Sequence, residues 1–106
     1  MSDTNFLQYY ELEDYLFSVV STRYAQSKTL TAFDFFCIVI WKSNRAKSKM
    51  AKRLMAKGHT NLDAAVASLL AELSEANDNR ARLSVLIEGW GFQLPMASAI
   101  LTVLYP

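Results

Sequence analysis

The sequence carries signals for the start of a helix at four places. Segments 31–34 (TAFD) and 60–63 (TNLD) have the pattern of capping boxes with Asp in place of Glu, residues 77–79 (NDN) can end one helix and cap another, and Pro95 suits the first turn of a last helix. Between these points apolar residues recur with the three-and-four spacing of helices that pack on a core. We therefore expect an all-α fold, a compact single domain of about six helices over residues 1–106.

The expected helices follow from these signals. The first begins at Asp3 or Thr4 and runs to about Ala25. The apolar run 35–41 would also suit a buried strand, but we expect a helix because no second convincing strand is present to pair with it. The remaining helices are expected in the basic segment 42–57 and at the following ranges: 62–76, about 80–88 and 95–104.

Length and composition exclude several classes of protein. With 106 residues, 52% of them hydrophobic, the chain fits one domain with its own core. No apolar run is long enough to cross a bilayer, and acidic residues stand where a signal peptide would carry basic ones, so we expect a cytoplasmic protein without a membrane partner. The single cysteine, Cys37, cannot form an internal disulfide and is expected in the core.

Positive charge is concentrated in one segment of a nearly neutral chain. The formal net charge is +1, yet no acidic residue occurs between Asp34 and Asp63. That interval holds seven of the eleven basic residues, namely Lys42, Arg45, Lys47, Lys49, Lys52, Arg53 and Lys57. Such a run can be a solvated face, or it can bind an acidic protein, a membrane surface or nucleic acid. A membrane-lying helix would carry Trp or Phe on its apolar face, and this one carries Ala, Met and Leu.

Two of the three glycines, Gly89 and Gly91, flank Trp90 between the last two expected helices. The first glycine would allow a positive φ at the end of one helix, and the second would keep side-chain bulk away from the backbone. Free N–H groups at the start of the next helix would then attract an anion, for which phosphate is the obvious choice. The alternative is a tight corner between helices without a ligand.

These residues resemble a known motif. The pattern Leu86-Ile87-Glu88-Gly89-Trp90-Gly91, followed by Met96-Ala97-Ser98-Ala99-Ile100-Leu101, resembles the helix-hairpin-helix motif, here at about 80–104. The order of elements over 31–105 is more loosely similar to the helical barrel of the helix-hairpin-helix base-excision DNA glycosylases. The resemblance implies that backbone amides around Gly89–Gly91 and at the start of the last helix hold a DNA phosphate, with a monovalent cation on the hairpin carbonyls.

The sequence departs from that family in three respects. Trp90 stands where a small aliphatic residue is usual, so it either fills a gap in the core or faces the ligand. The connection 92–95 is about one residue longer than the common hairpin and lacks the lysine of bifunctional glycosylases. The family's catalytic aspartate lies beyond the hairpin, past the last residue of this chain. We therefore assign no catalytic residue and expect no activity from this chain alone.

The sequence thus predicts a sequence-nonspecific DNA-binding module, glycosylase-like, with double-stranded DNA as its partner. The expected phosphate-binding residues are Gly89, Trp90, Gly91, Gln93, Lys42, Arg45, Lys49, Lys52 and Arg53. Two alternatives stay open: a fragment of a DNA repair glycosylase, and an interaction or oligomerisation module that uses the apolar run 100–104, which few following residues could cover.

Other candidate residues have structural explanations. His59 has no Cys or His at ligand spacing, so a metal site is not expected, and no cofactor is expected beyond the hairpin cation. Trp41 is read as a core residue rather than a platform for base stacking, and Asp34 as a helix cap. Tyr15, with the pair Tyr9-Tyr10, is read as packing at the rim of the core.

Overall fold

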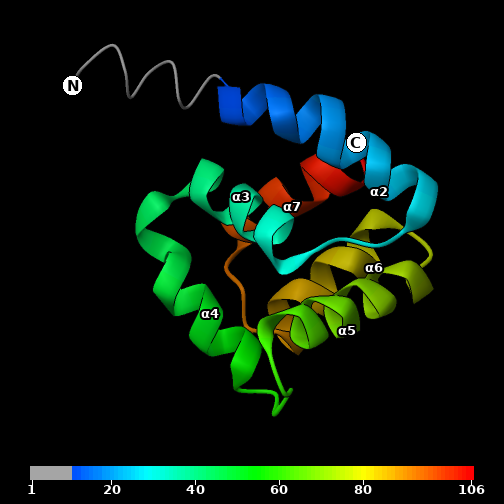
Figure 1. Cartoon of the computed structure of the whole chain (residues 1–106). Coiled ribbons are helices and arrows are strands. Elements are labelled where there is room, and N and C mark those ends of the chain that lie inside the picture. Colours follow the sequence, from blue (N-terminus) through cyan, green and yellow to red (C-terminus); the bar gives the residue numbers. More distant parts are fainter. Residues whose placement is uncertain (1–10) are drawn as a thin grey trace.

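Helices joined by short loops make up residues 11–106, the part of the chain that the computed structural model describes (Figure 1). This confirms the all-α prediction, and the described range contains no strand. After the helical residues 11–15, the elements in chain order are η1 (Leu16–Val20), α2 (Ser21–Ser27), α3 (Ala32–Lys42), η2 (Asn44–Ala46), α4 (Lys47–Met55), α5 (Leu62–Glu75), α6 (Asn79–Ser84), η3 (Val85–Gly89) and α7 (Leu94–Leu104). The predicted cap at Asp3 or Thr4 and the pair Tyr9-Tyr10 lie outside the described residues.

The first helix runs without a break through η1, a π-helical turn, into α2. Its buried stripe is Leu16, Val20 and Tyr24, which recur every four residues and face the core with no exposed surface. Phe17, which follows Leu16 in the sequence, is 39% exposed. The helix ends two residues later than expected, where Lys28 takes the left-handed conformation with φ of 56°.

Two of the predicted caps are present. The hydroxyl of Thr31 accepts a 3.1 Å hydrogen bond from the amide of Asp34 and begins α3. The carboxylate of Asp78 accepts a 2.8 Å bond from the amide of Ala81 and begins α6. Each bond satisfies an N–H that the first turn of a helix leaves without an internal partner.

The third cap differs from the prediction by one residue. Asn61, not Thr60, begins α5 by accepting a 2.8 Å hydrogen bond from the amide of Ala64. Asp63, expected to complete a capping box on its own helix, instead accepts a 2.8 Å bond from the amide of Ala32. The start of α5 therefore also caps the start of α3.

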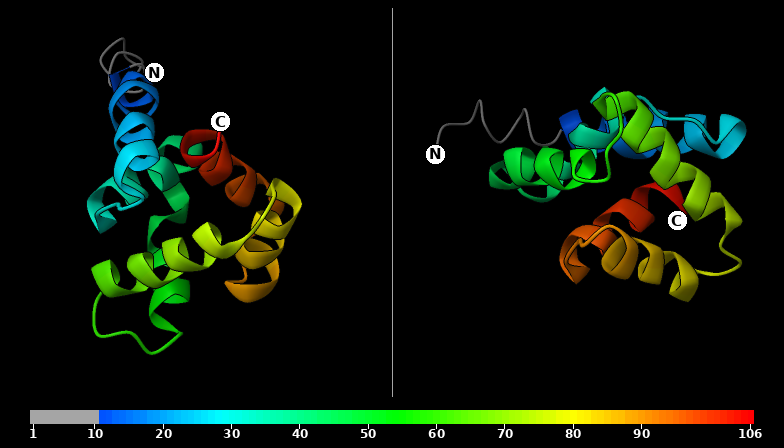
Figure 2. Two further views of the ribbon diagram at one scale, coloured as in Figure 1. Left: turned by 90° about the vertical axis from the view of Figure 1, so that its right-hand side faces the viewer. Right: turned by 90° about the horizontal axis from the view of Figure 1, so that it is seen from below.

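The last helix, α7, belongs to the core. Its buried residues are Met96, Ala97, Ala99, Ile100, Leu101, Val103 and Leu104. Figure 1 shows α7 in red between the N-terminal helix and α6, and it packs on α2, α3 and α6. The views of Figure 2 again place α7 beside α6. The expectation that the run 100–104 leaves an uncovered apolar face is therefore wrong, because other helices of the same chain cover it.

Within the described range, no helix combines the length and the apolar character that a bilayer crossing requires.

Candidate functional site: a cationic cleft between α4 and α7

The connection between η3 and α7 uses its two glycines differently from the prediction. Gly91, not Gly89, has the positive φ, at 74°. Gly89 lies in the last position of η3, where an added Cβ would meet no atom within 4 Å. A left-handed backbone is costly for residues with a Cβ, so Gly91 is the position at which the turn requires glycine.

The amides of this turn are already hydrogen-bonded within the chain. The N–H groups of Trp90, Gly91 and Phe92 donate to helix carbonyls at 3.2, 3.1 and 3.0 Å. Bonds of this kind close the C-terminus of a helix and leave nothing to offer a phosphate. Of the amides that were expected to bind a phosphate, only those in the first turn of α7 therefore remain. Pro95 has no N–H, so it removes one of these donors as well.

Trp90 fills the core. Only 4% of its surface is exposed, and its indole N–H donates a 3.0 Å hydrogen bond to the carboxylate of Glu72. The imidazole of His59 stacks on the indole with ring centroids 6.0 Å apart, and the ammonium of Lys57 lies 4.7 Å from the ring centre. Of the two roles that the sequence left open for Trp90, the structure shows the packing role, and the side chain is not placed to contact a phosphate.

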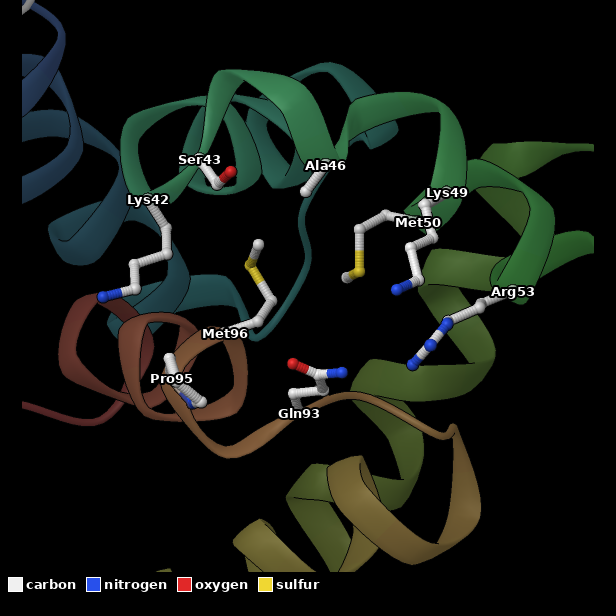
Figure 3. Close-up of a pocket in the computed structure, with 9 residues that line it drawn as sticks. All are labelled: Lys42, Ser43, Ala46, Lys49, Met50, Arg53, Gln93, Pro95 and Met96. Atoms are coloured by element: carbon white, nitrogen blue, oxygen red, sulfur yellow. The ribbon is translucent and has the colours of Figure 1, made fainter.

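A cleft of about 180 Å³ opens between the segment from the end of α3 to α4 and the start of α7 (Figure 3). Its lining residues are Lys42, Ser43, Ala46, Lys49, Met50, Arg53, Gln93, Pro95 and Met96. Figure 3 shows Lys49 and Arg53 reaching from α4 toward Gln93, while Met50 and Met96 point into the cleft from opposite sides. Residues 42–53 and 93–96 are distant in the sequence, so the fold alone brings them together.

The cleft is positively charged and contains no acidic residue. Lys42, Lys49 and Arg53 contribute three cations to its lining. In residues 11–106 the recorded salt bridge joins Arg23 to Asp34, and none involves these three side chains. One guanidinium nitrogen of Arg53 lies 3.9 Å from the point where a Cβ would stand on Gly91, which brings the basic helix and the glycine turn into contact. Cations held together without counterions attract anions from solution.

The predicted phosphate-binding residues divide into three groups. Lys42, Lys49, Arg53 and Gln93 line the cleft, and Gly91 borders it. Arg45 and Lys52 are exposed on the same segment but do not line the cleft, and Gly89 is exposed on the hairpin. Trp90 is buried elsewhere. Sequence reasoning missed Met50 and Met96 as site residues, because apolar residues at helical spacing look the same whether they face a core or a cleft.

A second polar cluster ties the first helix to α3. The carboxylate of Asp34, 2% exposed, accepts a 2.7 Å hydrogen bond from the hydroxyl of Tyr15 and lies 2.9 Å from a guanidinium nitrogen of Arg23. The predicted capping box is therefore only half formed, because Thr31 caps the amide of Asp34 while the carboxylate of Asp34 binds Tyr15 and Arg23 instead of capping α3. The hydrogen bond to Asp34 raises the pKa of Tyr15 above its ordinary value, with burial as the next cause.

Cys37 lies on α3 one turn after Asp34. It is a free thiol, partly buried and packed against the core, so the expected core role is only partly realised. Burial raises the pKa of the thiol, and the nearby negative charge of Asp34 adds to the effect.

No family model, curated protein or solved structure matches the chain. In the described range no three His, Cys, Asp or Glu side chains are grouped so that they could hold a metal ion. The helix pair expected at 80–104 is present as α6–η3 and α7, but its identity as a DNA-binding helix-hairpin-helix motif stays a prediction.

Proposed function

We propose that the chain is a sequence-nonspecific DNA-binding module that holds phosphates in the cleft and at the neighbouring exposed side chains Arg45 and Lys52. The observation that carries this proposal is the convergence of Lys42, Lys49 and Arg53 on one cleft without an acidic neighbour. Each of these cations can release a condensed counterion from DNA when it takes the place of that ion beside a phosphate.

The surroundings of the cleft support an extended contact. Arg45 and Lys52 are exposed on the same segment and can neutralise phosphates beyond the cleft. Ser43 and Gln93 are the remaining polar side chains beside the cations in Figure 3, and the amide of Gln93 can donate to a phosphate oxygen. Contacts to phosphates position a protein without reading base sequence, so little sequence preference is expected.

The hairpin has a different part in this proposal from the one that the family resemblance implies. Its amides are satisfied internally, and Gly91 lies beside the guanidinium of Arg53. A monovalent cation at the hairpin carbonyls stays a prediction. The proposal covers binding only and assigns no catalytic step. The interaction module through the last helix is not proposed, because Leu101 and Leu104 are 6% and 2% exposed.

The test is a titration of a fluorescently labelled DNA duplex, followed by anisotropy at two salt concentrations. Neutralisation of three to five phosphates would give a log–log salt slope of roughly −3 to −4.5. The Lys49→Ala/Arg53→Ala variant removes two charges from the cleft, and Lys47→Ala/Arg80→Ala removes two exposed charges from outside it. We expect the first variant to bind much more weakly than the second. Equal affinities of the two variants would contradict the proposal, and so would a wild type that binds neither the duplex nor a single strand at low salt.

A further inference from the structure

We infer that the strand held at the cleft is single-stranded, and that one of its unpaired bases enters the cleft while its phosphates lie on the cationic rim. This inference rests on the proposed function and narrows its ligand. It follows from the cleft being apolar below its charges, from its size, and from a second cavity beside it.

The floor of the cleft is apolar. Ala46, Met50, Pro95 and Met96 line it below the cations, and Figure 3 shows the two methionine side chains directed into the space. A surface that binds phosphates alone has no use for such a floor, because a phosphate is fully hydrated. An aromatic ring suits it, since a methionine sulfur makes favourable contacts with aromatic rings.

The size of the cleft fits one ring system. A protein cavity of about 150 Å³ lined by apolar side chains binds benzene, and this cleft has a volume of about 180 Å³. That space takes one base and is far too small for a base pair. A duplex presents its phosphates to such a surface and keeps its bases stacked, and moving a base out of the stack costs a few kcal/mol. In a single strand the bases are already unpaired, so this cost is much smaller.

A second cavity adjoins the cleft. It has a volume of about 410 Å³ and shares Lys42 and Pro95 with the first, and it is also lined by Trp41 and Leu94. Leu94 is 58% exposed, and the indole N–H of Trp41 is buried and finds no hydrogen-bond partner among the described residues. Two neighbouring hollows that share one lysine, each with apolar side chains in its lining, match the alternation of bases and phosphate in a single strand. In such complexes aromatic side chains bind bases and basic ones track the backbone.

The experiment compares two labelled strands that carry the same charge. One is an eight-residue oligothymidine, and the other has the same length and the same phosphates with an abasic unit at every position. Anisotropy titrations with the full chain at one low salt concentration give both affinities. Because a stacked base is worth about 1–3 kcal/mol, we expect the oligothymidine to bind at least about fivefold more tightly.

Tryptophan fluorescence supplies a second readout. The chain has two tryptophans, and Trp90→Phe leaves Trp41 as the only one. We expect the oligothymidine, but not the abasic strand, to quench Trp41 in this variant. If the abasic strand binds equally tightly and both strands release with salt, the inference fails while the DNA-binding proposal stands. If neither strand nor a duplex binds at low salt, both fail.

Discussion

A guanidinium nitrogen of Arg53 lies 3.9 Å from the position that a Cβ would occupy on Gly91. The side chain of the basic helix therefore occupies the surface next to the only glycine of the hairpin that has a left-handed backbone. The turn requires glycine at position 91 for its backbone conformation, whereas an added Cβ would meet Arg53 only at an ordinary van der Waals distance.

Substitution of the two hairpin glycines by alanine should have opposite effects on stability. Gly91→Ala places a Cβ on a φ of 74°, so we expect it to lower the free energy of unfolding by about 1–2 kcal/mol. Gly89→Ala lies in a helical turn with open space around it and should be neutral or stabilise by about 0.4–1 kcal/mol. Urea denaturation followed by circular dichroism measures both, and equal destabilisation by the two variants would contradict this account of the turn.

Single-charge variants should separate the cleft from the rest of α4. Lys49→Ala removes a cation that lines the cleft, whereas Lys47→Ala removes an exposed cation from the same helix. Because each neutralised phosphate contributes about 0.9 to the salt slope, Lys49→Ala should reduce the magnitude of the slope on duplex DNA by about 0.9. Lys47→Ala should leave the slope nearly unchanged. The measurement is a series of anisotropy titrations over several salt concentrations, and equal slopes for the two variants would point to a diffuse contact instead.

The ion pair between Arg23 and Asp34 should show strong coupling. The side chain of Arg23 is 52% exposed and that of Asp34 only 3%, so Arg23→Ala leaves a buried carboxylate with Tyr15 as its remaining side-chain donor. We expect this variant to lose about 1–3 kcal/mol of stability. Arg23→Ala/Asp34→Asn should lose less than the sum of the two single changes, because it leaves no charge unpaired. Chemical denaturation of the four proteins gives the coupling energy, and strict additivity would show that the pair contributes nothing.

The contribution of Tyr15 to the free energy of unfolding should disappear at alkaline pH. Its pKa is raised in the folded state, so the neutral phenol stabilises the fold fully below the ordinary pKa of 10, and that stabilisation is lost as pH rises through the folded pKa. At pH 7, Tyr15→Phe removes the hydrogen bond to Asp34 and should cost about 1 kcal/mol. The difference in unfolding free energy between wild type and variant should shrink above pH 10. A difference that stays constant from pH 7 to 11.5 would rule out this linkage.

A polar substitution in the last helix should destabilise the protein. Leu101→Ser places a hydroxyl at a position that is 6% exposed and removes an apolar side chain from the core. Large-to-small changes at such positions cost about 2–5 kcal/mol. We therefore expect a lower midpoint of thermal unfolding, with Ser98→Ala on the exposed face of α7 as the control. A variant with unchanged stability that loses an oligomeric state in sedimentation would instead restore the interaction module that the sequence left open.

Local features of the fold could be predicted from the sequence. The hydroxyl of Thr31, the carboxylate of Asp78 and the ring of Pro95 act on the backbone within a few residues, so their roles can be read from neighbouring positions. The cap of α5 could not be predicted in the same way, because Thr60 and Asn61 are both good cap residues and only the packing of the helix decides between them.

Contacts between distant segments could not be predicted. The basic segment was recognised by its composition, but its meeting with Gln93 and Met96 depends on how α4 lies against α7. The same holds for the partners of Asp34 and for the burial of Trp90, whose indole needs Glu72 from another helix. The family resemblance implies that amides of the glycine turn bind a phosphate, but in the structure these amides donate to carbonyls of the preceding helix.

The bond from the amide of Ala32 to the carboxylate of Asp63 joins the first turns of two helices that lie far apart in the sequence. This bond slows the exchange of the Ala32 amide hydrogen as long as the first turn of α5 holds the carboxylate of Asp63 in place. α3 ends at Lys42, on the wall of the cleft. A helix that contributes no residue to the cleft thus helps to fix the position of one that does, and the exchange rate of the Ala32 amide should report on the first turn of α5.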